Sequence, residues 1–261
     1  MRGNLGVFNI QMYERFLKFL KSRYRIIPFC RFSEKRDSFL ILRHDVEVSL
    51  EAACQMAKVE KALGITSTYL VYLANRFYNL FEAKDLRLVN EISKMGNEIG
   101  LHFDVAQYKT YGRPMRRRLV TELHVLEELT HRKVRSFAMH NRSLYKYDPF
   151  ARIPSYVNAY SFNKDHGVFY VSDSCRAWRI RDVQRLITQY PPKVQLLIHA
   201  FQWIPSARNR YVLLDKWFKE FDHGNDEYKR QWKSLWRRIE YIAKYDVEIR
   251  RCRRMLDFQY D

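Results

Sequence analysis

The feature that most constrains the fold is a regular alternation of short apolar runs with longer segments of helical periodicity. Apolar runs typical of buried strands cover residues 39–42, 66–72, 98–102, 134–139, 168–171 and 194–198. Helical spacing of apolar residues falls at residues 10–23, 49–63, 82–94, 114–129 and 182–190. Because strands that alternate with helices form parallel sheets with right-handed crossovers, the sequence predicts an α/β fold.

The length and continuity of the pattern indicate one domain. The chain has 261 residues, and one α/β barrel takes about 250. No internal repeat, low-complexity tract or Pro/Gly/Ser-rich linker divides it. We expect a single domain over residues 1–261, with a core at about 36–204 and a C-terminal helical extension, rich in Trp and basic residues, at about 208–254.

The charge balance is strongly basic. Lys and Arg number 47 against 29 Asp and Glu, which gives a net charge of +18. Nucleic acid, an anionic membrane and an acidic polysaccharide are all suitable partners for such a surface. Basic runs occur at Arg116–Arg118 and Arg250–Arg254, but no nucleic-acid-binding motif accompanies them. We therefore do not expect a nucleic-acid partner.

The N-terminal sequence and the cysteines bear on the compartment. The first apolar stretches are interrupted by Gln11, Glu14 and Lys18, so no secretory signal is recognised, and no window is apolar enough for a membrane span. The four cysteines are far apart and form no C-x-x-C pair, which argues against a disulfide framework or a thiolate zinc site. We expect a cytoplasmic protein, with peripheral contact at the inner face of an anionic membrane.

Acidic residues and histidines recur where the predicted strands end. These residues are Asp45 and Glu47 after the first strand, His102 and Asp104, His140, Asp173, and His199 after the last. Functional groups collect at the carboxyl ends of parallel strands. The sequence therefore predicts one shared site at this edge of the sheet.

Asp45 and Glu47 are the most specific of these residues. They are separated by one residue, so on an extended strand they face the same side, whereas His44 faces the opposite side and the core. Two carboxylates so close together need a cation or a proton between them. One carboxylate that binds a metal and one that remains a free base is a natural division. Carboxylates with histidines suit Zn²⁺ or a related divalent ion.

The stretch from Phe39 to Trp203 resembles the polysaccharide deacetylase-like family of metal-dependent carbohydrate esterases. The matching segments are Leu42–Glu47 (LRHDVE), Glu60–Thr68 (EKALGITST), Gly96–Asp104 (GNEIGLHFD), Ser136–His140 (SFAMH), Ser172–Ser174 (SDS) and Leu196–His199 (LLIH). The resemblance implies a deformed (β/α) barrel, here of about seven strands with extra C-terminal helices.

The resemblance also implies roles for the site residues. Asp45 matches the general base, Glu47 a metal ligand, and His199 the general acid. His102 matches the first histidine of the family's His-x-x-x-His ligand pair, but the position of the second is Ala106. We expect His140 as the third ligand, with Asp104 as the second choice. Glu47 stands where many members of the family carry Asp.

Five further residues are expected around the substrate: Arg43, Asp104, Arg142, Asp173 and Trp203. Asp173 is expected to orient either His199 or a sugar hydroxyl. Arg43 or Arg142 is expected to tune the base or to bind substrate, and Trp203 to line the pocket.

The activity that the resemblance implies is metal-dependent removal of an N-acetyl group from a sugar. Zinc is the first expectation for the ion, with cobalt, nickel, manganese and iron as alternatives. Because we expect the chain in the cytoplasm, the expected substrates are lipid-linked or nucleotide-linked precursors of a surface polysaccharide of the O-antigen or capsule type. Two alternatives stay open. One is a catalytically inactive sugar-binding protein, which Ala106 suggests; the other is a deformylase or other amide hydrolase.

Overall fold

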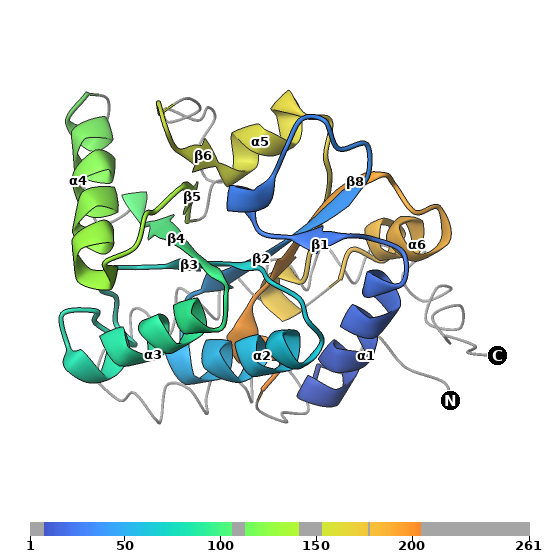
Figure 1. Cartoon of the computed structure of the whole chain (residues 1–261), viewed down its shortest axis with the longest axis horizontal. Helices are drawn as coiled ribbons and strands as arrows, with labels where there is room; N and C mark the ends of the chain where they lie inside the picture. Colours follow the sequence, from blue (N-terminus) through green and yellow to red (C-terminus); the bar gives the residue numbers. More distant parts are fainter. Residues whose placement is uncertain (1–7, 106–112, 141–152, 177, 205–261) are drawn as a thin grey trace.

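A computed structural model describes residues 8–105, 113–140, 153–176 and 178–204. Strands and helices alternate along it (Figure 1). In chain order the elements are α1 (Ile10–Lys21), β1 (Ile26–Ile27), β2 (Phe39–Val46), α2 (Leu50–Ala62), β3 (Thr68–Val71), α3 (Ala83–Lys94), β4 (Glu98–Phe103), α4 (Arg113–Thr130), β5 (Ser136–Met139), β6 (Val157–Asn158), α5 (Ala159–Asp165), β7 (Phe169–Ser172), α6 (Ile180–Thr188) and β8 (Lys193–Ile198).

The strands form one curled parallel sheet. Its order is β6-β5-β4-β3-β2-β8-β7, and β1 pairs with β2 outside this path. The path begins at β6 and ends at β7, so the half-barrel is open between these two strands. The predicted deformed barrel of about seven strands is confirmed. The predicted C-terminal extension at about 208–254 lies outside the described residues.

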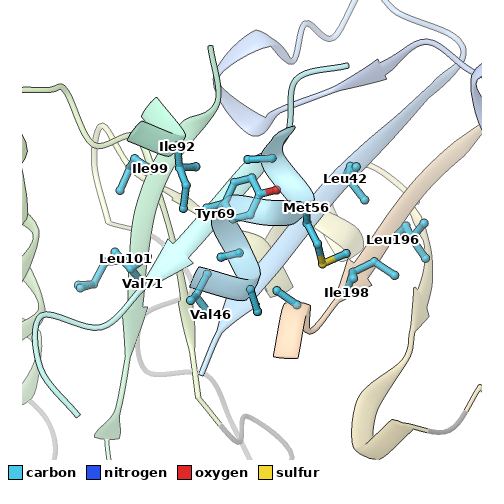
Figure 2. Close-up of a cluster of buried hydrophobic side chains, with 14 of the residues drawn as sticks. Leu42, Val46, Met56, Tyr69, Val71, Ile92, Ile99, Leu101, Leu196 and Ile198 are labelled. Carbon is cyan, nitrogen blue, oxygen red and sulfur yellow. The ribbon is translucent and has the colours of Figure 1, made fainter. Parts of the chain in front are cut away.

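The outer face of the sheet carries the larger core. Along β2, Leu40, Leu42 and Val46 point to this face, where they pack against the side chains of the covering helices. Figure 2 shows Met56 of α2 over Leu42, Leu196 and Ile198, which come from two neighbouring strands. All eight residues of β2 are buried, as expected for a central strand covered on both faces.

The inner face of the half-barrel is filled by a second, smaller apolar cluster. Its members include Phe39 and Ile41 of β2, Leu70 of β3, Ala138 of β5 and Phe162 of α5. Phe39 and Ile41 precede the first polar inner residue of β2, so this cluster closes the half-barrel toward the amino ends of the strands. Polar side chains are left at the carboxyl ends.

Local signals set the helix ends that frame the site. Ser49 caps α2 by accepting a hydrogen bond from the amide of Ala52 at 3.0 Å. Gly64 follows that helix with a φ of +64°, a left-handed conformation that favours glycine.

The sequence patterns did not indicate three short elements of the fold, β1, β6 and α5. Among the described residues, no helix has the length and apolarity needed to cross a membrane.

Candidate metal centre and flanking acid and base

Four strands deliver the predicted chemical groups to one edge of the sheet. Asp45 is on β2, His102 is on β4, and Glu47, His140 and His199 directly follow the ends of β2, β5 and β8. Because all of these strands are parallel, their carboxyl ends meet at the same mouth. The structure therefore brings together residues that lie up to 154 positions apart (199 − 45) in the sequence.

Glu47, His102 and His140 form a cluster that can hold a metal ion. One ligand atom from each residue lies within 4.8 Å of the others. Oε1 of Glu47 is 3.6 Å from Nε2 of His102 and 3.4 Å from Nε2 of His140. One carboxylate and two imidazoles that converge in this way are a common ligand set for a catalytic divalent ion with an open position.

The buried state of His102 fits a cation at this cluster. Its side chain is 1% exposed, and neither ring nitrogen has a hydrogen-bond partner among the described residues. A buried imidazole without partners is costly unless something else binds it. Burial raises the pKa of Glu47, but His199, His102 and His140 lower it more, so this carboxylate is ionised. The donor set therefore fits a divalent ion.

The second glycine of the GNEIGLH segment, Gly100, is required by the close packing of the strands. It lies two residues before His102 and shares its inner face of β4. A Cβ at this position would lie 2.5 Å from a side-chain carbon of Leu70 and 2.6 Å from the carbonyl oxygen of Ser136. Only glycine fits where β4 passes so close to its two neighbouring strands.

Asp45 forms a buried, bidentate ion pair with Arg43. Nε and Nη2 of Arg43 each donate to one oxygen of the carboxylate at 2.8 Å. Burial raises the pKa of Asp45, but Arg43 and His102 outweigh it and bring the pKa to about 2. Asp45 therefore faces the cluster as an ionised carboxylate, with Oδ2 3.7 Å from Nε2 of His102.

Arg43 supports the base and is not accessible to substrate. Its side chain is fully buried, and Nη1 donates to Oε1 of Gln195 at 3.1 Å. The guanidinium also lies over the ring of Tyr160, 4.7 Å from its centroid. Of the two roles predicted for Arg43, the geometry fits the tuning of Asp45 and contradicts direct substrate binding.

His199 faces the cluster from β8 and is supported from behind by Asp173. Nδ1 of His199 lies 2.6 Å from Oδ1 of Asp173, and Nε2 lies 3.9 Å from Oε1 of Glu47. Burial lowers the pKa of His199, but the carboxylates of Asp173 and Glu47 raise it to about 9. The imidazole is therefore protonated at neutral pH, with Nδ1–H on Asp173 and Nε2–H directed to the site. Asp173 is fully buried, which fits its predicted orienting role and leaves no access for a sugar hydroxyl.

The prediction that Trp203 lines a substrate pocket is wrong. Its side chain is fully buried, and its indole N–H donates to Oδ2 of Asp173 at 2.7 Å. A short helical turn at Ala200–Gln202 separates His199 from Trp203, and the indole contacts Asp173, the carboxylate that also holds His199.

Asp104 lies next to His140 at the mouth. Its Oδ1 is 3.5 Å from Nδ1 of His140, the nitrogen that faces away from Glu47. Asp104 is not a member of the three-residue cluster. Arg142 and Ala106 lie outside the described residues.

Sequence reasoning missed two supporting residues. Gln195 holds Arg43 from β8 and also donates to the carbonyl of Ala159 at 2.9 Å. Its signal was present, because it is the one polar residue in the apolar run from Val194 to Ile198. Tyr72 places its ring 4.7 Å from the ring of His102 and 5.8 Å from that of His140. Nothing in its sequence context distinguishes it from a core tyrosine.

The comparisons with known proteins give structural likenesses only. No family model matches the chain, and no curated protein sequence matches it. Among solved structures, the chain is similar to a CE4 family pseudoenzyme from Bacillus anthracis, with 19% identity, 75% of this chain and 64% of that chain covered, and a TM-score of 0.44. The chain thus spans less than two thirds of that structure.

Two further similar structures are described as an esterase and a deacetylase that act on carbohydrates. A family 4 acetyl xylan esterase from Clostridium thermocellum, in complex with a cobalt ion, is 11% identical over 69% of this chain and 84% of that chain, with a TM-score of 0.45. A peptidoglycan N-acetylglucosamine deacetylase is 12% identical over 78% and 89%, with a TM-score of 0.42. These likenesses are distant, so the function proposed below depends on the residues of the site.

Proposed function

We propose that this chain is a divalent-metal-dependent deacetylase of the polysaccharide deacetylase-like family, which hydrolyses an N-acetyl group on a sugar. One observation carries the proposal. The cluster of Glu47, His102 and His140 is approached by an ionised buried carboxylate, Asp45, 3.7 Å from His102, and by a carboxylate-supported imidazole, His199, 3.9 Å from Glu47. A metal site flanked by a base and an acid is the arrangement that metal-assisted amide hydrolysis requires.

Glu47, His102 and His140 would hold the ion, and zinc is the first candidate. When bound, such an ion supplies Lewis acidity toward an amide carbonyl and acidifies water at its open position. Asp45 would accept a proton from the attacking water. A carboxylate with a pKa of about 2 is a weak base, so an ion held at the cluster would supply the acidification that such a base needs. Arg43 keeps the carboxylate ionised and fixed through both of its oxygens.

His199 supplies the proton for the leaving group. Water adds to the carbonyl carbon, the C–N bond breaks, and the products are acetate and a free amine. Nε2–H of His199 donates the proton that the departing nitrogen needs, while Nδ1–H stays hydrogen-bonded to Asp173. The raised pKa of His199 keeps this proton available at neutral pH.

The substrate that we propose is an N-acetylated sugar on a lipid-linked or nucleotide-linked precursor of a surface polysaccharide. Both carriers bear phosphate, and the net charge of +18 favours such anions as well as an anionic membrane surface. This part of the proposal includes action in the cytoplasm at the inner face of the membrane. Vesicles of anionic and neutral lipid test it, and equal binding to both would contradict it.

The central experiment measures metal content and acetate release together. The purified chain should bind zinc and release acetate from N-acetylated sugars, and a chelator should abolish the release. His199→Gln and Asp45→Asn should each lower turnover by about 100- to 10,000-fold with metal still bound. His124→Gln, on the exposed side of α4, is the matched control and should change nothing.

Two outcomes would contradict the proposal. A chain that binds no zinc at micromolar concentration is not a metal-dependent hydrolase and is better described as an inactive sugar-binding protein. Turnover unchanged in both His199→Gln and Asp45→Asn would remove the acid and the base from their assigned roles.

A further inference from the structure

His140 presents its two ring nitrogens to two different carboxylates. Nε2 lies 3.4 Å from Oε1 of Glu47, inside the three-residue cluster. Nδ1 lies 3.5 Å from Oδ1 of Asp104, on the other side of the ring. Both carboxylates are largely buried, at 12% and 21% side-chain exposure. Only one of the two nitrogens can face a cation at the cluster, so the other is available as a donor to Asp104.

The register of the sheet explains why these two residues meet. Strands β4 and β5 pair in parallel, with His102 opposite Ala138 and Phe103 opposite Met139. The amide of His140 then donates to the carbonyl of Phe103 at 2.8 Å. Asp104 is the residue after β4 and His140 is the residue after β5, so the pairing places them side by side just past the strand ends.

The two histidines of the cluster are fixed in different ways. His102 belongs to β4, is 1% exposed, and has the ring of Tyr72 at 4.7 Å. His140 follows the end of β5 and is 15% exposed. Tyr72 also contacts this ring at 5.8 Å, and the ring of His102 lies 5.4 Å away. Ring contacts do not decide which nitrogen of His140 carries the proton, whereas a carboxylate on the outer nitrogen does.

We propose that Asp104 is a positioning residue of the metal site: its carboxylate accepts a hydrogen bond from Nδ1–H of His140 and leaves Nε2 free to bind the cation. This inference rests on the proposed function. An outer carboxylate of this kind selects the tautomer, orients the ring and makes the ligating nitrogen more basic. Asp104 is then neither the third ligand nor a substrate contact, the two roles that the sequence suggested.

The test is the affinity of the full, metal-stripped chain for Zn²⁺, measured by competition with a chromophoric chelator. Asp104→Ala should weaken zinc binding by about 10- to 100-fold. Asp104→Asn keeps an acceptor oxygen and should lose less. Asp37→Ala is the matched control: Asp37 is exposed and precedes β2, at the end opposite the site, so zinc affinity should not change.

The visible absorption of the Co²⁺-loaded protein separates an outer carboxylate from a ligand. If Asp104 is an outer residue, the cobalt bands of Asp104→Asn keep the position and intensity of the unsubstituted protein, because the ligand set is the same. Altered bands would make Asp104 a direct ligand and overturn the assignment. Unchanged zinc affinity in Asp104→Ala would overturn it as well.

The failure of this assignment and the failure of the proposed function give different results. If the unsubstituted chain binds zinc and releases acetate while Asp104→Ala binds zinc equally well, only the positioning role is wrong. If the unsubstituted chain binds neither Zn²⁺ nor Co²⁺, the proposed function fails and this assignment fails with it. Thermal unfolding of each variant shows whether a weakened affinity belongs to a folded protein.

Discussion

The indole N–H of Trp203 donates a 2.7 Å hydrogen bond to Oδ2 of Asp173. The other oxygen of the same carboxylate lies 2.6 Å from Nδ1 of His199. All of these groups are buried. The proposed acid is therefore fixed through a carboxylate that has partners on both oxygens, and the aromatic residue that the sequence placed in the substrate pocket is part of this support.

Replacement of Trp203 by Phe tests this support. The variant keeps an aromatic ring beside Phe8, whose ring lies 4.8 Å from that of Trp203, but it removes the hydrogen bond to a buried carboxylate. We expect the free energy of unfolding to fall by about 1.5–3 kcal/mol. We also expect kcat to fall by about tenfold, the equivalent of about 1.4 kcal/mol. Urea unfolding and acetate release measure the two effects.

Trp178→Phe is the matched control. The ring of Trp178 lies 6.1 Å from that of Trp203, and its own N–H has no hydrogen-bond partner among the residues that the structure describes. The same change of ring therefore removes no hydrogen bond, and kcat should be retained. Equal effects of the two substitutions would show that ring packing, and not the bond to Asp173, is what matters.

The pH dependence of turnover should report on His199. Burial lowers the pKa of His199, but Asp173 and Glu47 raise it to about 9. An acid must carry its proton, so activity should decline as the pH rises through this pKa. A bound cation offsets the charge of Glu47, so the limb in the loaded enzyme should lie at or below about 9.

Asp173→Asn should move this limb downward. The amide can still accept from Nδ1–H, but it carries no negative charge, so the pKa should fall toward the ordinary histidine value of about 6.5. The pH profile of kcat, with zinc content checked at each pH, gives the measurement. If activity declines at the same pH in both proteins, the pH dependence does not come from His199.

Alternation along β2 was enough to predict which side chains share the site. Asp45 and Glu47 both face the metal cluster, and His44 points to the outer core, where its ring stacks on Tyr69 at 4.3 Å. Period-two alternation holds for any strand, so this part of the site needed no structure. The parallel arrangement then implied that the strand ends meet.

Other parts of the site depend on relations that one sequence does not contain. The choice between His140 and Asp104 depends on the register of β4 against β5, and pattern alone leaves register open. The position of Trp203 depends on the direction that the chain takes after β8. The strand order was also invisible, because β7 pairs with β8 and not with β6, its predecessor in the sequence.

The ion pair between Arg43 and Asp45 should make stability depend on pH in a defined direction. Burial raises the pKa of Asp45, but Arg43 outweighs it and lowers the pKa to about 2, below the ordinary value of about 3.9. The pair therefore stabilises the fold above pH 4 or so, and this contribution is lost as the pH falls toward 2. Arg43→Met should cost about 3–5 kcal/mol at neutral pH, since it leaves a buried carboxylate unpaired.

Urea unfolding at pH 7 and near pH 3 measures this cost. The deficit of Arg43→Met relative to the unsubstituted chain should shrink at the lower pH, where Asp45 is more readily protonated in the variant. The double variant Arg43→Met with Asp45→Asn buries no charge at either position. It should therefore be more stable at pH 7 than Arg43→Met alone. A double variant that is less stable than the single one would contradict this account.

Tyr13 of α1 contacts residues that lie next to the proposed base and behind the proposed acid. Its hydroxyl donates to Oε1 of Glu60 at 2.5 Å, and the same oxygen lies 2.7 Å from Nε2 of His44, the neighbour of Asp45. The ring of Tyr13 lies 5.5 Å from that of Trp203. The hydroxyl therefore supports the strand of the base, and the ring supports the residue behind the acid.

Tyr13→Phe separates these two contributions because it removes the hydroxyl and keeps the ring. We expect a loss of about 1–3 kcal/mol in the free energy of unfolding and faster amide hydrogen exchange in α1. Tyr69→Phe is the matched control, since Tyr69 donates to the same oxygen of Glu60 at 2.9 Å from β3. It should be destabilised similarly without faster exchange in α1. The pH limb assigned to His199 should be unchanged in Tyr13→Phe, because the contact with Trp203 is kept. A shifted limb would show that the hydroxyl also acts on the acid.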